Sequence, residues 1–93
     1  MSIIESGLFL VFERFPDHKE AVKALYRECG DFQSLCEDYR QCDAALRYWR
    51  QSSEDYAPAR KIEYSVLLQE LEEEIGKILK SSEQLAAQKN NEF

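Results

Sequence analysis

Apolar residues recur along the middle of the chain with the spacing of a helical stripe. From Phe32 to Trp49 they follow one another at alternating steps of three and four residues. This heptad spacing places the side chains on one face of a helix that packs along a second helix. The stripe consists of Phe32, Leu35, Tyr39, Cys42, Leu46 and Trp49. We therefore predict a helix over residues 31–52 with these side chains in its core.

A second apolar stripe follows after a short polar link. Its members are Tyr64, Leu67, Leu71, Ile75 and Ile78, with Leu68 and Leu79 on its flank. The link, SSEDYAP at residues 52–58, contains turn and cap residues, and Pro58 suits the first turn of a new helix. This pattern predicts a second helix over residues 58–86 and a frayed helix end over residues 87–93.

The two stripes fit one antiparallel hairpin. A short link makes consecutive helices antiparallel neighbours, and facing residues in such a pair have position numbers with a constant sum. In five pairs the two residue numbers add up to the same total, to within one. The pairs are Trp49 with Tyr64, Leu46 with Leu67, Cys42 with Leu71, Tyr39 with Ile75, and Leu35 with Ile78. Because the stripes come from separate segments, their agreement predicts a coiled-coil-like helical hairpin.

A shorter helix is expected before the hairpin. Residues 17–29 follow Pro16 and have acidic residues near their start, which is a helix-start pattern. The apolar face of this segment consists of Val22, Leu25, Tyr26 and Cys29. At about 100° per residue, this face is out of line with the stripe that begins at Phe32. We predict a break at Gly30-Asp31, where Gly can end one helix and Asp can cap the next.

Residues 3–15 fit two interpretations. Ile3, Ile4, Leu8, Val11, Phe12 and Phe15 have helical spacing. The run LFLVF at residues 8–12 is also a good strand, and the helical stripe leaves out Phe9 and Leu10. We favour a short helix and keep a strand as the alternative.

Composition supports a single all-α domain over residues 1–93. Hydrophobic residues make up 44% of the chain and charged residues 32%, while three Gly and two Pro offer few turns for a β-fold. The formal net charge is −6. Because affinity for nucleic acid depends mainly on neutralising phosphates, we expect no nucleic-acid partner.

The three cysteines, Cys29, Cys36 and Cys42, are candidate chemical groups. Structural zinc sites usually pair thiolates two to four residues apart, whereas these lie seven and six apart. We therefore expect small apolar side chains at a helix interface, and no metal or cofactor. A thiol-based redox or metal-responsive module is the alternative. An odd cysteine count, and an apolar run preceded by Glu5 and no Lys or Arg, favour reduced thiols in the cytoplasm.

Other polar residues have ordinary structural explanations. His18, the one histidine, falls in the first turn of a predicted helix and is expected on the surface. Asp43 lies four residues before Arg47, the spacing of an ion pair on one helix face. We predict no catalytic residue, so the protein is not expected to be an enzyme.

Several apolar residues lie outside both stripes and form a candidate interaction surface. They are Tyr48, Ile62, Val66, Phe9, Leu10 and Phe12. A single hairpin seam buries little surface, so these residues favour a protein–protein interaction or scaffold module that forms a homodimer and binds a further protein partner. Peripheral membrane association through residues 3–15 is a second alternative, but that segment lacks the basic face such helices use.

Residues 15–80 contain motifs that resemble a known family. The motifs are FPDHKEAVKALY at 15–26, DFQSLCEDYRQCDAAL at 31–46 and EEIGKIL at 73–79. They resemble the YdcH-like family of small bacterial helical-hairpin proteins. Tyr39 and Cys42 stand where family members often have His and Leu, and the second arm here is acidic where theirs is Lys-rich. The resemblance implies the hairpin fold and carries over no catalytic or binding residue.

Overall fold

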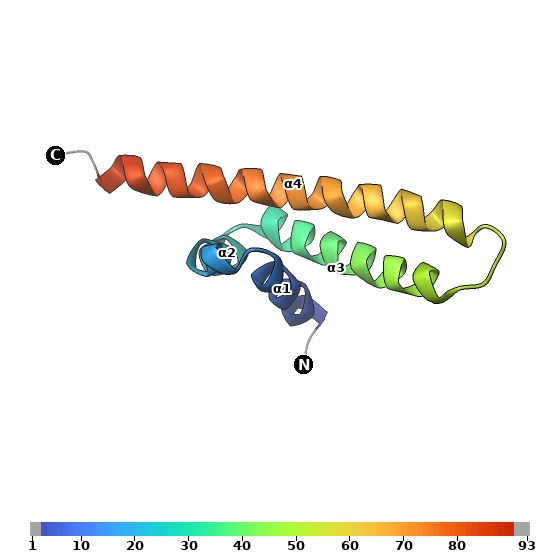
Figure 1. Cartoon of the computed structure of the whole chain (residues 1–93). Coiled ribbons are helices and arrows are strands. Elements are labelled where there is room, and N and C mark those ends of the chain that lie inside the picture. The colour runs from blue at the N-terminus through green and yellow to red at the C-terminus, as the bar shows by residue number, and fades with distance from the viewer. Residues whose placement is uncertain (1–2, 91–93) are drawn as a thin grey trace.

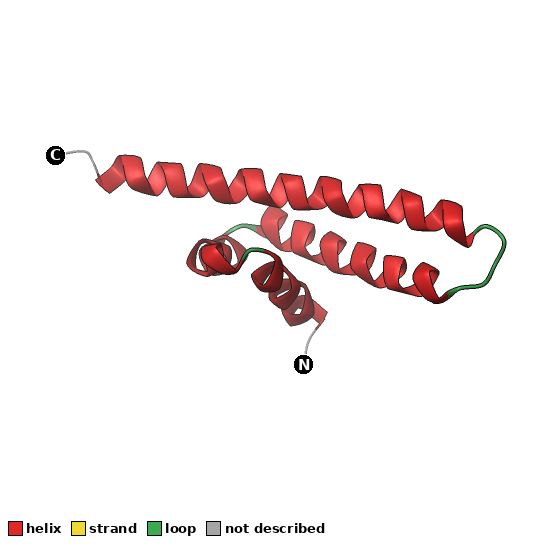
Figure 2. Cartoon of the chain, in the orientation of Figure 1, coloured by secondary structure: helices red, strands yellow, loops and turns green. Residues whose placement is uncertain are grey.

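The part of the chain that the structure describes is almost entirely helical. The computed structural model describes the backbone of residues 3–90 and the side chains of residues 7–84. The elements are α1 (Ile3–Arg14), η1 (Pro16–His18), α2 (Lys19–Glu28), α3 (Gly30–Gln51) and α4 (Ala57–Asn90), where η1 is a short 3-10 helix. Over residues 3–90 there is no strand (Figure 2). The predicted all-α class is confirmed, and residues 3–14 are a helix and not a strand.

α3 and α4 lie side by side as an antiparallel hairpin, which confirms the predicted architecture (Figure 1). The loop between them covers residues 52–56, and Pro58 lies in the first turn of α4. α4 extends well past the start of α3, because it has 34 residues against 22. It runs to Asn90, beyond the predicted end at residue 86. Residues 91–93 of the predicted frayed end lie outside the described part.

The break between α2 and α3 falls at Cys29, one residue before the predicted break at Gly30-Asp31. Cys29 has an extended backbone, with φ −127° and ψ 110°, and its N–H donates to the carbonyl oxygen of Leu25 at 2.8 Å. Gly30 is the first residue of α3 and does not have a positive φ. The expected cap roles of Gly30 and Asp31 are therefore not observed. One extended residue is enough to turn α2 away from the axis of α3.

α1 crosses α3 at close range, and Gly7 makes this approach possible. A β-carbon on Gly7 would lie 2.9 Å from the carbonyl oxygen of Cys36, closer than side-chain carbons normally come to a backbone oxygen. One turn later in α1, Val11 is fully buried in the hydrophobic core. The segment that fits either a helix or a strand by sequence is thus held as a helix by its packing on α3.

The core lies between the hairpin and the two N-terminal helices. α3 contributes most of it, through the stripe that the heptad pattern predicts, together with Cys36. The buried apolar side chains are Val11, Val22, Phe32, Leu35, Cys36, Tyr39, Cys42, Leu46, Ala57, Ile75 and Leu79. Trp49 is only partly buried and packs edge-to-face on Tyr48 and Tyr56 at the loop end of the hairpin.

The predicted stripe on α4 is rotated relative to the observed one. Leu67, predicted in the core, is 43% exposed, whereas Leu79, predicted on the flank, is buried. The cause is the packing of the N-terminal segment on one side of α4. The Phe15 ring lies 3.7 Å from the position of a Gly76 β-carbon. That contact draws the buried face of α4 towards α1 and α2, and it leaves Leu67 on the uncovered side.

Two of the predicted cross-hairpin pairs line shared hollows in the structure. Leu35 and Ile78 line one hollow along the seam, and Cys42 and Leu71 line the next. Tyr64, Leu71 and Ile78 are partly buried, while Ile75 is fully buried. Both pairs therefore lie along the same side of the α3–α4 seam.

Candidate functional site

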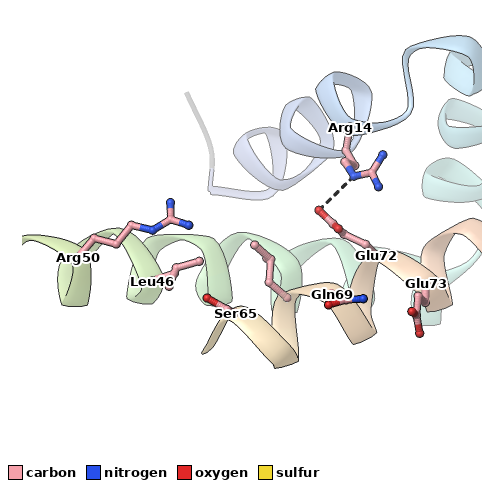
Figure 3. A pocket seen from close by; sticks show the side chains of 8 residues that line it. Arg14, Leu46, Arg50, Ser65, Gln69, Glu72 and Glu73 are labelled. Atoms are coloured by element: carbon pink, nitrogen blue, oxygen red, sulfur yellow. Dashed lines mark ion pairs between the residues drawn. The ribbon is translucent and has the colours of Figure 1, made fainter. Parts of the chain in front are cut away.

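A polar cluster joins α1, α3 and α4 at the centre of the molecule. The Glu72 carboxylate accepts a hydrogen bond from the Tyr39 hydroxyl at 2.8 Å and pairs with the Arg14 guanidinium at 3.1 Å. Figure 3 shows Arg14 reaching from α1 towards Glu72, beside an open hollow. That hollow is lined by Arg14, Leu46, Arg50, Ser65, Leu68, Gln69, Glu72 and Glu73. The three helices therefore share one carboxylate.

The hydrogen bond and the ion pair of this cluster hold the three helices together. Burial, followed by the hydrogen bond to Glu72, raises the pKa of Tyr39 well above its ordinary value, so the phenol stays protonated and donates. A buried tyrosine needs a partner for its hydroxyl, and this is the signal that sequence reasoning missed. The identity of that partner depends on the arrangement of α3 and α4, because Tyr39 and Glu72 are 33 residues apart.

The three cysteines are spread over different environments. Cys36 is buried under α1, and burial raises the pKa of its thiol to about 12. Cys42 is buried in the hairpin, its thiol donates to the carbonyl oxygen of Tyr64 at 3.4 Å, and burial raises its pKa as well. Cys29 is partly exposed at the break between α2 and α3. All three are free thiols, and the two buried ones are poor nucleophiles because reaction requires the thiolate.

Thiol labelling of the native protein is expected to be selective for Cys29. A rise in pKa from 9.0 to about 12 lowers the thiolate fraction of Cys36 at neutral pH about a thousandfold. Iodoacetamide labelling, followed by mass spectrometry, should therefore modify Cys29 in the folded protein, and Cys36 and Cys42 only after denaturation. The Cys29→Ser variant is the control and should show almost no labelling until unfolded. Rapid native labelling of Cys36 would instead indicate an activated thiol and favour the redox alternative.

Several charged side chains near the candidate residues pair along their own helix. The predicted pair of Asp43 with Arg47 is confirmed, at 3.0 Å. Arg40 contacts Glu37 at 2.6 Å, and its hydrogen bonds hold the pKa of the Glu37 carboxyl below the ordinary value. His18 lies 2.7 Å from Glu83, so η1, which leads into α2, contacts the C-terminal part of α4. The basic residues of α3 are thus partly neutralised within the chain.

The six residues of the predicted interaction surface do not form one patch. Tyr48 is exposed near the C-terminal end of α3, and its ring packs on Trp49. Ile62 and Val66 are exposed one turn apart on the outer face of α4. On α1, Phe9 is exposed. Leu10 and Phe12 are partly buried against the core.

The packing of α1 also bears on the membrane alternative for residues 3–15. Among its described apolar side chains, Phe9 is the exposed one, while the others pack against the hydrophobic core. Within residues 3–90, no helix is both long and apolar enough to cross a membrane. The side chains of Ile3 and Ile4 lie outside the described part.

A groove that sequence reasoning did not predict runs along the α3–α4 seam. It consists of two adjoining hollows that share Asp38 and Leu71, and we call it the hairpin groove. Its lining residues are Cys29, Asp31, Phe32, Ser34, Leu35, Asp38, Gln41, Cys42, Ala45, Tyr64, Leu67, Leu71, Glu74 and Ile78. Leu67, Leu71 and Ile78 give it an apolar wall on α4. The sequence feature that could have predicted the groove is the wide apolar face of α4. Leu67 and Leu68 are adjacent, so both cannot lie in one narrow seam.

Comparison with protein-family models, curated proteins and solved structures found no significant match to this chain. The resemblance to the YdcH-like family therefore stays a prediction. Among the described side chains, no group of three or more His, Cys, Asp or Glu residues is placed to hold a metal ion. The features available for a functional assignment are thus the polar cluster, the exposed apolar residues of α4 and the hairpin groove.

Proposed function

We propose that the protein is a non-enzymatic protein–protein interaction module that forms a homodimer. The supporting observation is the pair Ile62 and Val66, which are 67% and 52% exposed, one turn apart, on the outer face of α4. We call this pair the α4 ridge. Exposed apolar side chains that adjoin on a rigid helix are typical of contact sites between proteins. The remainder of the hairpin serves as the scaffold that holds the α4 ridge in place.

A two-fold contact between α4 helices suits the α4 ridge. In an antiparallel arrangement, Ile62 of each copy lies against Val66 of the other, so one surface serves both partners. The contact is short compared with the area that stable dimers bury. We therefore expect a weak dimer, with a dissociation constant in the micromolar range or above, that responds to protein concentration.

Sedimentation velocity over a range of concentrations tests this dimer. Val66→Glu places a carboxylate in the contact and should raise the dissociation constant at least about tenfold. Phe9→Glu is the matched control, because Phe9 is a similarly exposed apolar residue, 49% against 52%, on α1. Phe9→Glu should leave the dimer unchanged. A wild-type protein that stays monomeric at high micromolar concentration would contradict the proposed dimer.

The proposal includes a cytoplasmic location in a bacterial cell. It is supported by the three cysteines, which are free thiols distributed over separate sites in the fold. The bacterial origin rests on the resemblance to the YdcH-like family.

A further inference from the structure

The hairpin groove lies on the side of the α3–α4 seam opposite α1. On the covered side, Arg14 and Phe15 contact Glu72 and Gly76 of α4, and the apolar side chains of α1 pack against the core. On the other side, no described helix takes the corresponding place. Leu67 is 43% exposed there. One side of the seam is thus covered within the described chain, and the other faces outwards.

The floor of the hairpin groove and its wall on α4 are mainly apolar. Leu35 and Cys42 form a buried floor, and Leu67, Leu71 and Ile78 stand along the wall that α4 provides. From Leu67 to Ile78 the wall is roughly 16 Å long at about 1.5 Å per helical residue, or three turns. A groove of this shape between two helices fits a third helix whose apolar residues recur at steps of three and four.

The rim of the hairpin groove is acidic. Every charged side chain that lines its described part is a carboxylate, namely Asp31, Asp38 or Glu74. Glu70 lies three residues after Leu67 and four before Glu74, so it extends the same edge of α4. A helix lying in the groove places its flanking side chains against these carboxylates. Lysine or arginine at the flanks is therefore favoured, and acidic residues are repelled.

We infer that the hairpin groove binds a basic amphipathic helix of another protein. A second copy of this chain is the poorer occupant. A two-fold contact through the groove brings the acidic rims of both copies together in a protein of net charge −6. The groove and the α4 ridge are separate surfaces, so this inference does not depend on the proposed dimer.

Synthetic peptides of about 14 residues, long enough to cover three turns, test the inference on the full chain. The first peptide has leucines at steps of three and four and lysines elsewhere. The second keeps the leucines and has glutamates in place of the lysines. The third has the composition of the first, with its leucines spread around the helix. By titration calorimetry, the first peptide should bind at least about tenfold more tightly than either control.

Paired variants of the protein locate the binding. Leu67→Gln should weaken binding of the first peptide about tenfold, while Ile62→Gln, which changes an exposed apolar residue outside the groove, should change it less than about twofold. Asp38→Asn with Glu74→Gln should weaken binding about fivefold and flatten its salt dependence. Glu20→Gln with Asp55→Asn removes the same charge elsewhere and should have little effect.

Amide chemical shifts of the wild-type protein give a readout that needs no variant. Addition of the first peptide should perturb residues of the hairpin groove, such as Asp38, Ala45 and Leu71, and leave the α4 ridge unchanged. Three results would overturn the inference: equal binding of the lysine and glutamate peptides, equal losses in Leu67→Gln and Ile62→Gln, or shifts spread over the whole acidic surface. If Leu67→Gln converts a dimer into a monomer, the groove holds a second copy, and the inference is equally wrong.

Discussion

Replacement of Ile75 by alanine is expected to lower the free energy of unfolding by about 2–5 kcal/mol, as deletion of a buried aliphatic side chain does. Ile75 is 0% exposed and lies where α4 packs on α3 and on the N-terminal helices. The cavity left by the substitution adjoins side chains from several helices, so no single helix can move to fill it. Urea denaturation followed by far-UV circular dichroism measures the effect.

Ile62→Ala is the matched control for this prediction. It makes the same chemical change on the same helix, at a side chain that is 67% exposed. Alanine also has a higher helix propensity than isoleucine, so the expected change is within about 0.5 kcal/mol in either direction. The comparison is made at a protein concentration below dimer formation. Similar losses for both variants would mean that α4 does not pack in the observed rotation.

Gly7→Ala is expected to lower the free energy of unfolding by about 1–3 kcal/mol, although alanine is the better helix former. The added β-carbon would lie 2.9 Å from the carbonyl oxygen of Cys36, which is backbone and cannot rotate away. α1 must then move off α3, and Val11 loses part of its packing. Native iodoacetamide labelling of Cys36 should also become faster, because α1 covers that thiol.

Gly30→Ala supplies the control for Gly7→Ala. A β-carbon on Gly30 meets nothing within 4 Å, and its backbone does not need a positive φ. The substitution should therefore raise the free energy of unfolding by about 0.5 kcal/mol, through the lower conformational entropy of the unfolded chain. Destabilisation by both substitutions would contradict the close crossing of α1 and α3 as the cause of the Gly7 effect.

The stripe on α3 was predictable because α3 lies at the centre of the fold. Phe32, Leu35, Tyr39 and Leu46 face α4 in any antiparallel hairpin, and all of them are buried. The stripe on α4 was predicted less well, because Leu67 and Leu68 are equally apolar and adjacent. Heptad spacing alone favours Leu67. The packing of Phe15 and Arg14 on α4 selects the neighbouring face instead.

The candidate sites were less predictable than the helices. Tyr48 was singled out because no apolar stripe includes it, and it is exposed, with one side of its ring on Trp49. Glu72 belongs to the acidic run at residues 72–74, a pattern typical of a solvent-exposed helix face. In the structure it instead accepts a hydrogen bond from Tyr39 and pairs with Arg14. Local spacing cannot reveal the role of Glu72, because Tyr39 and Arg14 are brought to it from distant parts of the chain.

The periodic placement of apolar residues determines that this chain is all-α and that its second half folds as an antiparallel hairpin. Helix formation and hairpin pairing depend on apolar residues at regular short intervals, and these intervals can be found in the sequence. The side of α4 that is buried, the role of Gly7 and the shared carboxylate of Glu72 depend on where α1 docks. The hairpin groove exists for the same reason: α1 covers one side of the seam, and the structure leaves the opposite apolar side open within the described residues.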